Sequence, residues 1–226
     1  MATEKKRKAA TGKRTGPAAR GRRAPLTREG IVAMALELIE QQGFAAFSTR
    51  RLGEALGCEA MSIYHHFPSK QHLLDALVAE VIAGFRWPPP GLDPVEHLRR
   101  VCHAYRETAH RYPRFFPYLA VHRLNMPDGV DFIERVLAAF EAVASDRERA
   151  ARWFRVVGYY LVGAGLDETS GYAAGPAAAE PVSEAYVAAH CPRLAAAAPC
   201  FRQPQWDATF DLGLEALIGA MTGSGD

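Results

Sequence analysis

The stretch STRRLGEALGCEAMSIYHHFPSK (residues 48–70) contains two short helix patterns separated by one glycine-containing turn. Ser48 or Thr49 is a favourable N-cap for the first pattern, and Gly57 is a favourable C-terminal stop. The second pattern covers residues 59–66, about two turns of helix, and stops before a proline, which disfavours helical geometry in the residue ahead of it. Two short helices joined by a tight turn predict a helix-turn-helix, whose second helix is the recognition helix.

Longer helices are predicted on both sides of this pair. Apolar residues recur at helical spacing from Ile31 to Leu38, after the N-cap Thr27 and before a stop at Gly43. On the other side, Ser69 caps a helix that extends to residue 85 and ends at the sequence WPPPG. We therefore predict a basic arm at 1–24, a helix-turn-helix domain with its linking helix at 25–86, and a second domain at 87–226.

The predicted recognition helix has an inner and an outer face. Ile63 and Phe67 are four residues apart and form the inner face, so residues 60, 61, 64 and 65 lie outside or on the flank. The hydroxyl of Tyr64 can donate to a phosphate, and polar residues around the helix can reach phosphates or base edges. The adjacent His65 and His66 point about 100° apart on a helix, so no shared metal ion is expected.

The charge of the chain is unevenly distributed. Residues 1–24 contain nine Lys or Arg and one acid, so this arm carries +8 and the other residues carry −6 of the net +2. A basic arm without apolar periodicity is predicted to be disordered and attracted to a polyanion, nucleic acid first, while a solubilising tail is the alternative. Arg20, Arg22 and Arg23, in the stretch ARGRRAP, are the predicted minor-groove contacts.

Composition argues against secreted and membrane proteins. The chain is 49% hydrophobic, which is enough for a core without crosslinks, and its four cysteines form no C-x-x-C pair. We expect free thiols and a cytoplasmic location. No apolar run reaches the roughly 18 to 20 residues of a membrane span, and no apolar segment follows the basic N-terminus, so neither an anchor nor a secretory signal is expected.

Residues 87–226 are predicted to be helical throughout. Asp93 and the following proline begin a helix whose His103, Glu107 and His110 lie opposite its apolar face, where a solvated polar surface is favoured over a metal site. A short helix bracketed by Pro113 and Pro117 follows, and a further helix begins at residue 127. Residues 171–205 are rich in Ala, Gly and Pro and are predicted to form a loop with one short helix near 182–190.

The segment ARWFRVVGYYLVGAGLDE (residues 151–168) is apolar nearly all round, and the last helix repeats this with apolar residues and glycines in register. One chain of this size leaves surplus apolar surface, so we predict a homodimer through a four-helix bundle, with a central core helix of a monomer as the alternative. The predicted interface residues are Gly158, Leu161, Val162, Gly165, Phe210, Leu214 and Leu217.

Residues 27–77 resemble the DNA-binding domain of the tetracycline-repressor (TetR) family of bacterial regulators. The resemblance consists of a Gly-Phe after the first helix, Ser-Thr-x-x-Leu-x-x-x-Leu-Gly, Tyr-x-His-Phe and Ser-Lys-x-x-Leu-Leu, in one register. One departure is Glu59, where the family often has Ser or Thr as N-cap; its charge suits a helix N-terminus but repels phosphate. The DNA contacts implied by the resemblance are Thr49, Arg50, Glu59, Ala60, Met61, Ser62, Tyr64, His65, His66 and Lys70.

The C-terminal half resembles the tetracycline-binding members more weakly, through GYYLVGAGLDE and FDLGLEALIGAM. Where those members use two histidines for the drug and its magnesium, this chain is aligned with Arg86 and Tyr118, which argues against tetracycline as the ligand. Aromatic residues with a few polar neighbours instead predict an apolar effector pocket, with plain core as the alternative. The predicted ligand residues are Arg86, Tyr105, Phe116, Tyr118, His122, Arg123, Asn125, Phe140, Trp153 and Tyr160.

Together these patterns predict an all-α protein with an N-terminal three-helix helix-turn-helix domain and a larger helical ligand-binding and dimerisation domain. The expected function is that of a homodimeric transcriptional regulator, most simply a repressor released from a palindromic double-stranded operator by a small apolar or aromatic effector, without a cofactor. Two alternatives stay open, a helical enzyme using its histidines and a helix-turn-helix that contacts protein rather than DNA. No nucleophile, carboxylate pair or phosphate loop supports an enzyme, and no catalytic residue is predicted.

Overall fold

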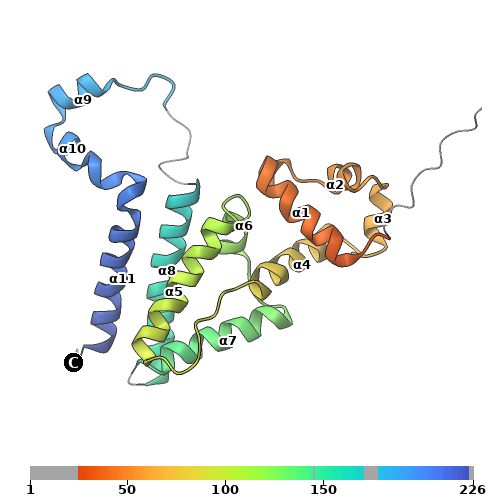
Figure 1. Cartoon of the computed structure of the whole chain (residues 1–226), viewed down its shortest axis with the longest axis horizontal. Helices are drawn as coiled ribbons and strands as arrows, with labels where there is room; N and C mark the ends of the chain where they lie inside the picture. The colour runs from red at the N-terminus through yellow and green to blue at the C-terminus, as the bar shows by residue number, and fades with distance from the viewer. Residues whose placement is uncertain (1–24, 145, 171–177, 224–226) are drawn as a thin grey trace, which may run out of the picture.

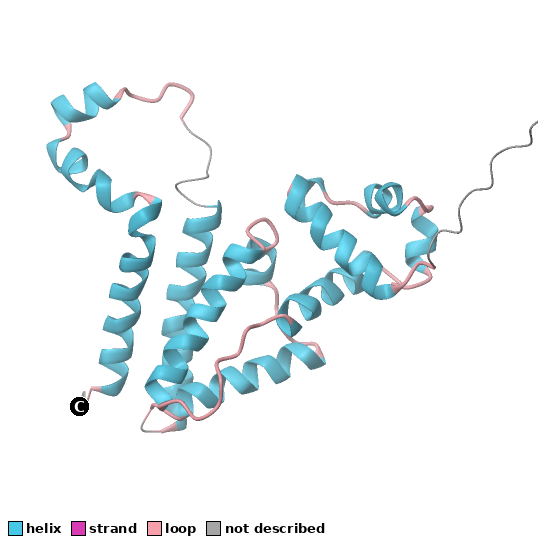
Figure 2. Ribbon diagram, in the orientation of Figure 1, coloured by secondary structure: helices cyan, strands magenta, loops and turns pink. Residues whose placement is uncertain are grey.

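The structure, a computed structural model, describes residues 25–144, 146–170 and 178–223 (Figure 1). All regular secondary structure in these residues is helical (Figure 2), which confirms the predicted all-α class. The basic arm, with the predicted contacts Arg20, Arg22 and Arg23, lies outside the described residues. Within the described ranges, no helix is both long enough and apolar enough to cross a membrane.

The helix-turn-helix domain begins with α1 (Arg28–Gln42), a 3-10 turn η1 (Phe44–Ala46), α2 (Thr49–Leu56) and α3 (Ala60–Tyr64). The hydroxyl of Ser48 accepts from the backbone N–H of Arg51 at 3.3 Å, so Ser48 rather than Thr49 is the N-cap of α2. Gly57 ends α2 in the left-handed region with φ 67°, as the sequence predicts. The recognition helix α3 is shorter than the predicted two turns, because the chain turns at residues 65 and 66.

Helix α4 (Lys70–Ala83) connects this domain to the rest of the molecule (Figure 1). Its N-cap Ser69 accepts from the backbone N–H of His72 at 3.3 Å, and the three prolines 88–90 follow its end in extended chain. Along its length α4 packs against α1 on one side and against a helix of the second domain, α7 (Pro127–Glu141), on the other. Helix α4 is therefore in contact with both domains.

The second domain is a bundle in which α5 (Pro94–Arg111), α8 (Arg147–Ser170) and α11 (Trp206–Thr222) lie side by side, and α7 packs against α5 and α8 (Figure 1). The apolar faces of these helices form a core that includes Leu98, Phe140, Val157, Phe210 and Leu214. The other helices of this domain are α6 (Phe116–Val121), α9 (Glu184–His190) and α10 (Pro192–Ala197).

Two predictions about short helices need correction. Pro117 does not end α6 but lies in its first turn, where the missing N–H of proline has no intrahelical partner to lose. The single helix predicted near 182–190 is confirmed as α9, but α10 and two 3-10 turns, η2 (Ala198–Phe201) and η3 (Gln203–Gln205), follow it. Pro192 lies in the first turn of α10, where a missing N–H again loses no intrahelical bond. The Ala, Gly and Pro content of this segment therefore led to a prediction of loop where short helices form.

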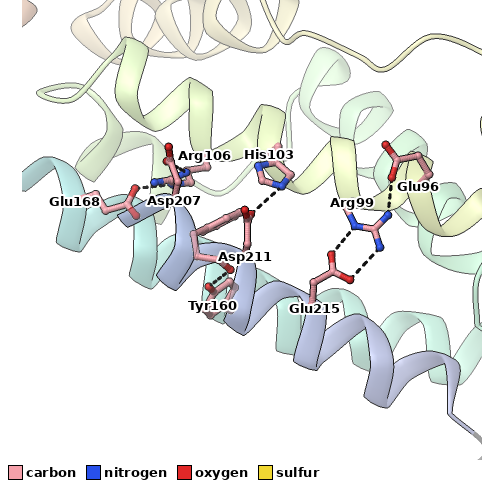
Figure 3. Close-up of polar contacts among 10 residues, drawn as sticks. Glu96, Arg99, His103, Arg106, Tyr160, Glu168, Asp207, Asp211 and Glu215 are labelled. Atoms are coloured by element: carbon pink, nitrogen blue, oxygen red, sulfur yellow. Dashed lines mark hydrogen bonds and ion pairs between the residues drawn. The ribbon is translucent and has the colours of Figure 1, made fainter. Parts of the chain in front are cut away.

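A row of ion pairs joins α5 to α11 (Figure 3). Arg99 donates to both carboxylate oxygens of Glu215 over 2.5 and 3.0 Å. Arg106 bridges Glu168 of α8 and Asp207 of α11 over 2.7 and 2.8 Å. Hydrogen bonding to the Arg99 guanidinium lowers the pKa of the Glu215 carboxyl, so this contact holds its charge at neutral pH.

The predicted solvated face of α5 is therefore partly covered. His103 Nε2 lies 3.3 Å from a carboxylate oxygen of Asp211, and His110 Nε2 lies 2.6 Å from a carboxylate oxygen of Glu168. The face is polar and partly solvated, as the sequence predicts, since Glu107 and His110 are exposed. The carboxylate partners could not be predicted from the periodicity of α5, because they are on α8 and α11, which are distant in the chain.

Candidate DNA-binding surface and effector pocket

The recognition helix has a buried inner face and an exposed outer face that carries both polar and apolar side chains. Ile63 and Phe67 are each 1% exposed, whereas Met61 is 64% exposed. The hydroxyls of Tyr64 and Thr49 lie 3.3 Å apart, which joins the outer end of α3 to the start of α2. The exposed methionine can contact thymine methyl groups, and the hydroxyl groups beside it can donate to phosphates. Of the other predicted contacts, Glu59 and His65 are exposed, and Ala60, Ser62 and His66 are half-buried.

Basic side chains flank this surface. Arg50 is exposed on α2 and lies 3.8 Å from Glu54, and Lys70 donates to the backbone carbonyl of Phe47 over 3.5 Å. Arg28, which the sequence analysis did not single out, donates to the backbone carbonyl of His66 and lies with its guanidinium 4.1 Å from the centre of the Phe67 ring. Arg28 thereby stabilises the turn after α3. In the sequence, its position at the start of α1 is the only indication of this role.

Close approach of α2 to α3 depends on a glycine. A Cβ built on Gly53 would lie 2.8 Å from the carbonyl oxygen of Cys58 and 3.2 Å from the backbone nitrogen of Ala60. Both atoms belong to backbone, which cannot swing aside as a side chain can. Gly53 therefore sets the distance between the two helices of the motif.

Helix α6 joins the second domain to the helix-turn-helix. Phe115, directly before α6, is fully buried in the core of the first domain, and Glu40 of α1 accepts from its backbone N–H over 2.9 Å. Tyr118 stacks on Phe44 with ring centres 4.6 Å apart, and its hydroxyl lies 3.3 Å from the side-chain nitrogen of Gln71. These contacts place the α6 segment against both α1 and α4.

His122, the residue after α6, lies between α4 and a cavity. Its Nε2 is 3.2 Å from a carboxylate oxygen of Asp75 on α4, and its side chain is 10% exposed. Its Nδ1 is buried and has no hydrogen-bond partner in the part of the chain that the structure describes. An unpaired buried ring nitrogen is costly, so a group that bonds to it on binding gains free energy.

A cavity of about 530 Å³, partly open to solvent beside the exposed Tyr159, is lined by residues of α5, α6, α7 and α8, and its size suits a small organic ligand. Its wall is mainly apolar, with Phe132, Phe140 and Phe154 contributing rings. Burial raises the pKa of Tyr105 in this wall to about 12, so its hydroxyl stays protonated at neutral pH. The arrangement can enclose an apolar molecule and offer it a few polar contacts.

The structure brings only part of the predicted ligand residues to this cavity. Tyr105, His122 and Phe140 line it. The other predicted ligand residues lie elsewhere. Arg86 lies beside Glu107 in a polar groove at α5 and α11, Phe116 lies in the core against Gly165, and Tyr118 stacks on Phe44. Arg123 and Asn125 lie at the surface, Trp153 packs against the bundle core, and the Tyr160 hydroxyl donates to the carbonyl of Phe210.

Helix α8 supplies cavity residues that the sequence analysis missed. Arg155 and Tyr159 line the cavity, with the Arg155 guanidinium donating to the Tyr159 hydroxyl over 3.0 Å. Arg155 interrupts an otherwise apolar stretch of this helix, and this was the available signal, but its side chain is also exposed to solvent, which a charge alone would require. Gly158, Leu161 and Val162, predicted for the dimer interface, line the cavity as well.

The predicted interface residues need further correction. Phe210 and Leu214 are 2% and 0% exposed, and a Cβ on Gly165 would meet the ring of Phe116 at 2.6 Å, so these three face inward. Leu217 is half-buried against the same core. The outward faces of α8 and α11 carry other apolar or small residues: Val156, Tyr159, Gly163, Leu212, Ala216 and Gly219.

Two family models match the chain over both domains. Residues 31–77 match the model of the tetR family of bacterial regulatory proteins, and residues 88–222 match the model of the tetracycline repressor-like C-terminal domain. The chain belongs to the TetR family. The resemblance found in the recognition-helix stretch is thereby confirmed and extends to the second domain.

Named TetR relatives resemble the chain to different extents. The class D tetracycline repressor of Escherichia coli is 35% identical over 92 residues, 39% of this chain and 42% of that protein. The chain thus matches less than half the length of this relative. The class A repressor from transposon 1721 of Escherichia coli is 27% identical over 203 residues, 84% of this chain and 88% of that protein.

A solved TetR-family structure has the same fold. A possible TetR family transcriptional regulator from Streptomyces coelicolor A3(2) superposes with a TM-score of 0.71 at 25% identity, covering 86% of this chain and 98% of that one. The order of a small helix-turn-helix domain followed by a larger helical domain therefore fits the TetR architecture.

Proposed function

We propose that the protein is a cytoplasmic, homodimeric transcriptional repressor that binds a palindromic double-stranded operator and is released by a small apolar effector. The observation that carries this proposal is the position of His122, which lines the effector cavity and whose Nε2 lies 3.2 Å from a carboxylate oxygen of Asp75 on α4. Helix α4 packs on α1 of the DNA-binding domain. A ligand in the cavity thus contacts His122, and His122 contacts α4, which packs on the DNA-binding domain.

DNA contact is assigned to the exposed side of α3 and its flanks. Tyr64 and Thr49 donate to phosphates, Arg50 and Lys70 add positive charge, and Met61 meets base edges in the major groove. Two such heads in a dimer would enter successive major grooves about 34 to 36 Å apart. The basic arms at 1–24 would add salt-sensitive contacts to phosphates or the minor groove.

Selection of bound sequences from a pool of random duplexes tests the DNA-binding function. We expect the purified protein to enrich an inverted repeat, because a symmetric dimer presents two equal heads. An Arg50→Ala/Tyr64→Phe double variant should bind the enriched duplex about tenfold or more weakly, since it loses a phosphate-facing charge and hydroxyl. Retention of full affinity by this variant, or no enrichment at low salt, would favour a role in protein contact instead.

The dimer is proposed to form through the outward faces of α8 and α11. Leu212 is 75% exposed and Val156 41%, and a Cβ on Gly219 would meet no described atom within 4 Å. Exposed large apolar residues next to open glycines allow two helices of a partner to approach closely. The result is a four-helix bundle, as the sequence predicts, made by different residues of the same two helices.

Release is proposed to pass through the contact between His122 and Asp75. An Asp75→Asn variant keeps the shape of this contact but removes the charge that holds the imidazole. In a screen for compounds that release the wild type from its operator, any active compound should release Asp75→Asn only at about tenfold or higher concentration. Glu80→Gln, which removes a carboxylate from the exposed side of the same helix, is the matched control. Equal responses of both variants and the wild type would rule out this route.

The relatives named above are repressors, and we propose that this chain likewise has no catalytic activity. Two of the histidines that could perform acid-base chemistry are held in structural contacts, since His103 and His110 face carboxylates of the bundle. A turnover that disappears in His66→Ala while DNA binding is retained would overturn this part of the proposal.

A further inference from the structure

We propose that the effector is a weak organic acid with an apolar body, whose acidic hydroxyl is recognised by His122 and whose anionic form is attracted by Arg155. This inference rests on the proposed function insofar as it takes the α5–α8 cavity as the effector site. It is carried by two polar side chains that line one largely apolar cavity, His122 and Arg155.

The unpaired nitrogen of His122 can accept a hydrogen bond from the ligand. Asp75 lies 3.2 Å from Nε2, and a carboxylate there favours the tautomer that carries its proton on Nε2. Nδ1 is then a lone-pair acceptor, buried and without a partner among the described residues. An acidic phenol satisfies it by donating its O–H or by transferring the proton to Nδ1. A carboxylate, which is already ionised at neutral pH, satisfies it when Nδ1 takes a proton from solvent and donates it in a hydrogen bond to the carboxylate.

The transfer is balanced in charge. When the proton moves from the ligand oxygen to Nδ1, the imidazolium lies between the Asp75 carboxylate and the new ligand anion. Each ring N–H then donates to a negative oxygen, which is the strong, charge-assisted form of the hydrogen bond. No oxidant, metal or further reactant is needed for this step.

Arg155 supplies the second positive group. Its guanidinium donates to the Tyr159 hydroxyl over 3.0 Å and lies 4.7 Å from the centre of that ring. This contact uses one of five N–H groups and leaves the positive charge in place. Neither Asp nor Glu is among the described residues that line the cavity. The electrostatic character of the wall therefore favours an anion over a cation or a neutral amine.

Phenylalanine rings, including Phe85 just after the end of α4, define much of the remaining shape. Phe132, Phe140 and Phe154 face the cavity together with aliphatic residues of α5 and α7. A volume of about 530 Å³ accommodates a fused two-ring or three-ring body next to the two polar groups. We therefore choose 2-naphthoate as the probe and methyl 2-naphthoate as its neutral counterpart, since the two differ only in the acidic group.

Calorimetric titration of the full chain without DNA tests the inference. We expect 2-naphthoate to bind at least tenfold more tightly than its methyl ester, a difference of about 1.4 kcal/mol. His122→Phe and Arg155→Leu should each weaken naphthoate binding about tenfold and leave ester binding within twofold. Arg155→Lys, which keeps the charge, should retain part of the preference.

Arg152→Leu is the matched control, because Arg152 lies on the exposed side of the same helix, pairs with Glu148 and does not line the cavity. It should leave both affinities unchanged, and thermal melts of all variants verify folding. Equal affinity for acid and ester, binding of neither, or an equal loss in Arg152→Leu overturns the inference. Because no DNA is present, such a failure is separate from failure to enrich an operator, which would remove the proposed function itself.

Discussion

Replacing Leu212 by aspartate is expected to convert the dimer into monomers and to weaken operator binding at least a hundredfold. Leu212 is 75% exposed on the outward face of α11, where the proposed partner covers it. A symmetric interface would bury two such carboxylates without partners, at a cost of several kcal/mol for each ion. Separate monomers also lose the high effective concentration that a dimer gives its second head at the second half-site.

Light scattering after size exclusion and titration of an inverted-repeat duplex measure the two effects. Val130→Asp is the matched control, because Val130 is 49% exposed on α7, away from the α8 and α11 faces. It should remain dimeric and bind normally. A Leu212→Asp protein that stays dimeric would place the interface elsewhere, whereas a monomer with unchanged operator affinity would contradict binding by two linked heads.

The helices of the first domain were predictable because their signals are local. The hydroxyls of Thr27, Ser48 and Ser69 cap α1, α2 and α4 as the sequence indicates, and the Asp93 carboxylate does the same for α5. A cap and its partner are two or three residues apart, so the sequence contains the whole interaction. The same applies to Gly57, whose left-handed backbone ends α2.

The outward face of α8 could not be predicted in this way. A helix that is apolar nearly all round has no periodic contrast, so Val156 and Leu161 look equivalent in sequence. In the structure Val156 is 41% exposed and Leu161 is 8% exposed. The packing of α5, α7 and α11 against α8 determines which of the two is buried. The predicted interface residues were misassigned for this reason.

The effector cavity shows the same limit. Tyr118 is aromatic and is aligned with a ligand-binding histidine of the tetracycline-binding members, yet it stacks on Phe44 of the other domain. The unpaired Nδ1 of His122 and the position of Arg155 in the wall depend on four helices meeting. Residue type suggested a pocket, but only the tertiary arrangement separates its lining from the core.

Replacing Gly53 by alanine is expected to weaken operator binding about ten- to a hundredfold, although alanine is the better helix former. The added Cβ would lie 2.8 Å from the carbonyl oxygen of Cys58, so α2 and the start of α3 must move apart. Overpacking of this kind typically costs about 1 to 3 kcal/mol, which exceeds the roughly 1 kcal/mol that alanine gains over glycine in a helix.

Operator titration and thermal melting of Gly53→Ala distinguish a displaced recognition helix from general unfolding. A folded protein with a small decrease in melting temperature and a large loss of affinity is the expected combination. Gly84→Ala is the control, since its Cβ would meet no described atom closer than 3.5 Å, at the end of α4. Because helix propensity alone favours alanine at position 53, an unchanged affinity would mean that the spacing between α2 and α3 does not position the DNA contacts.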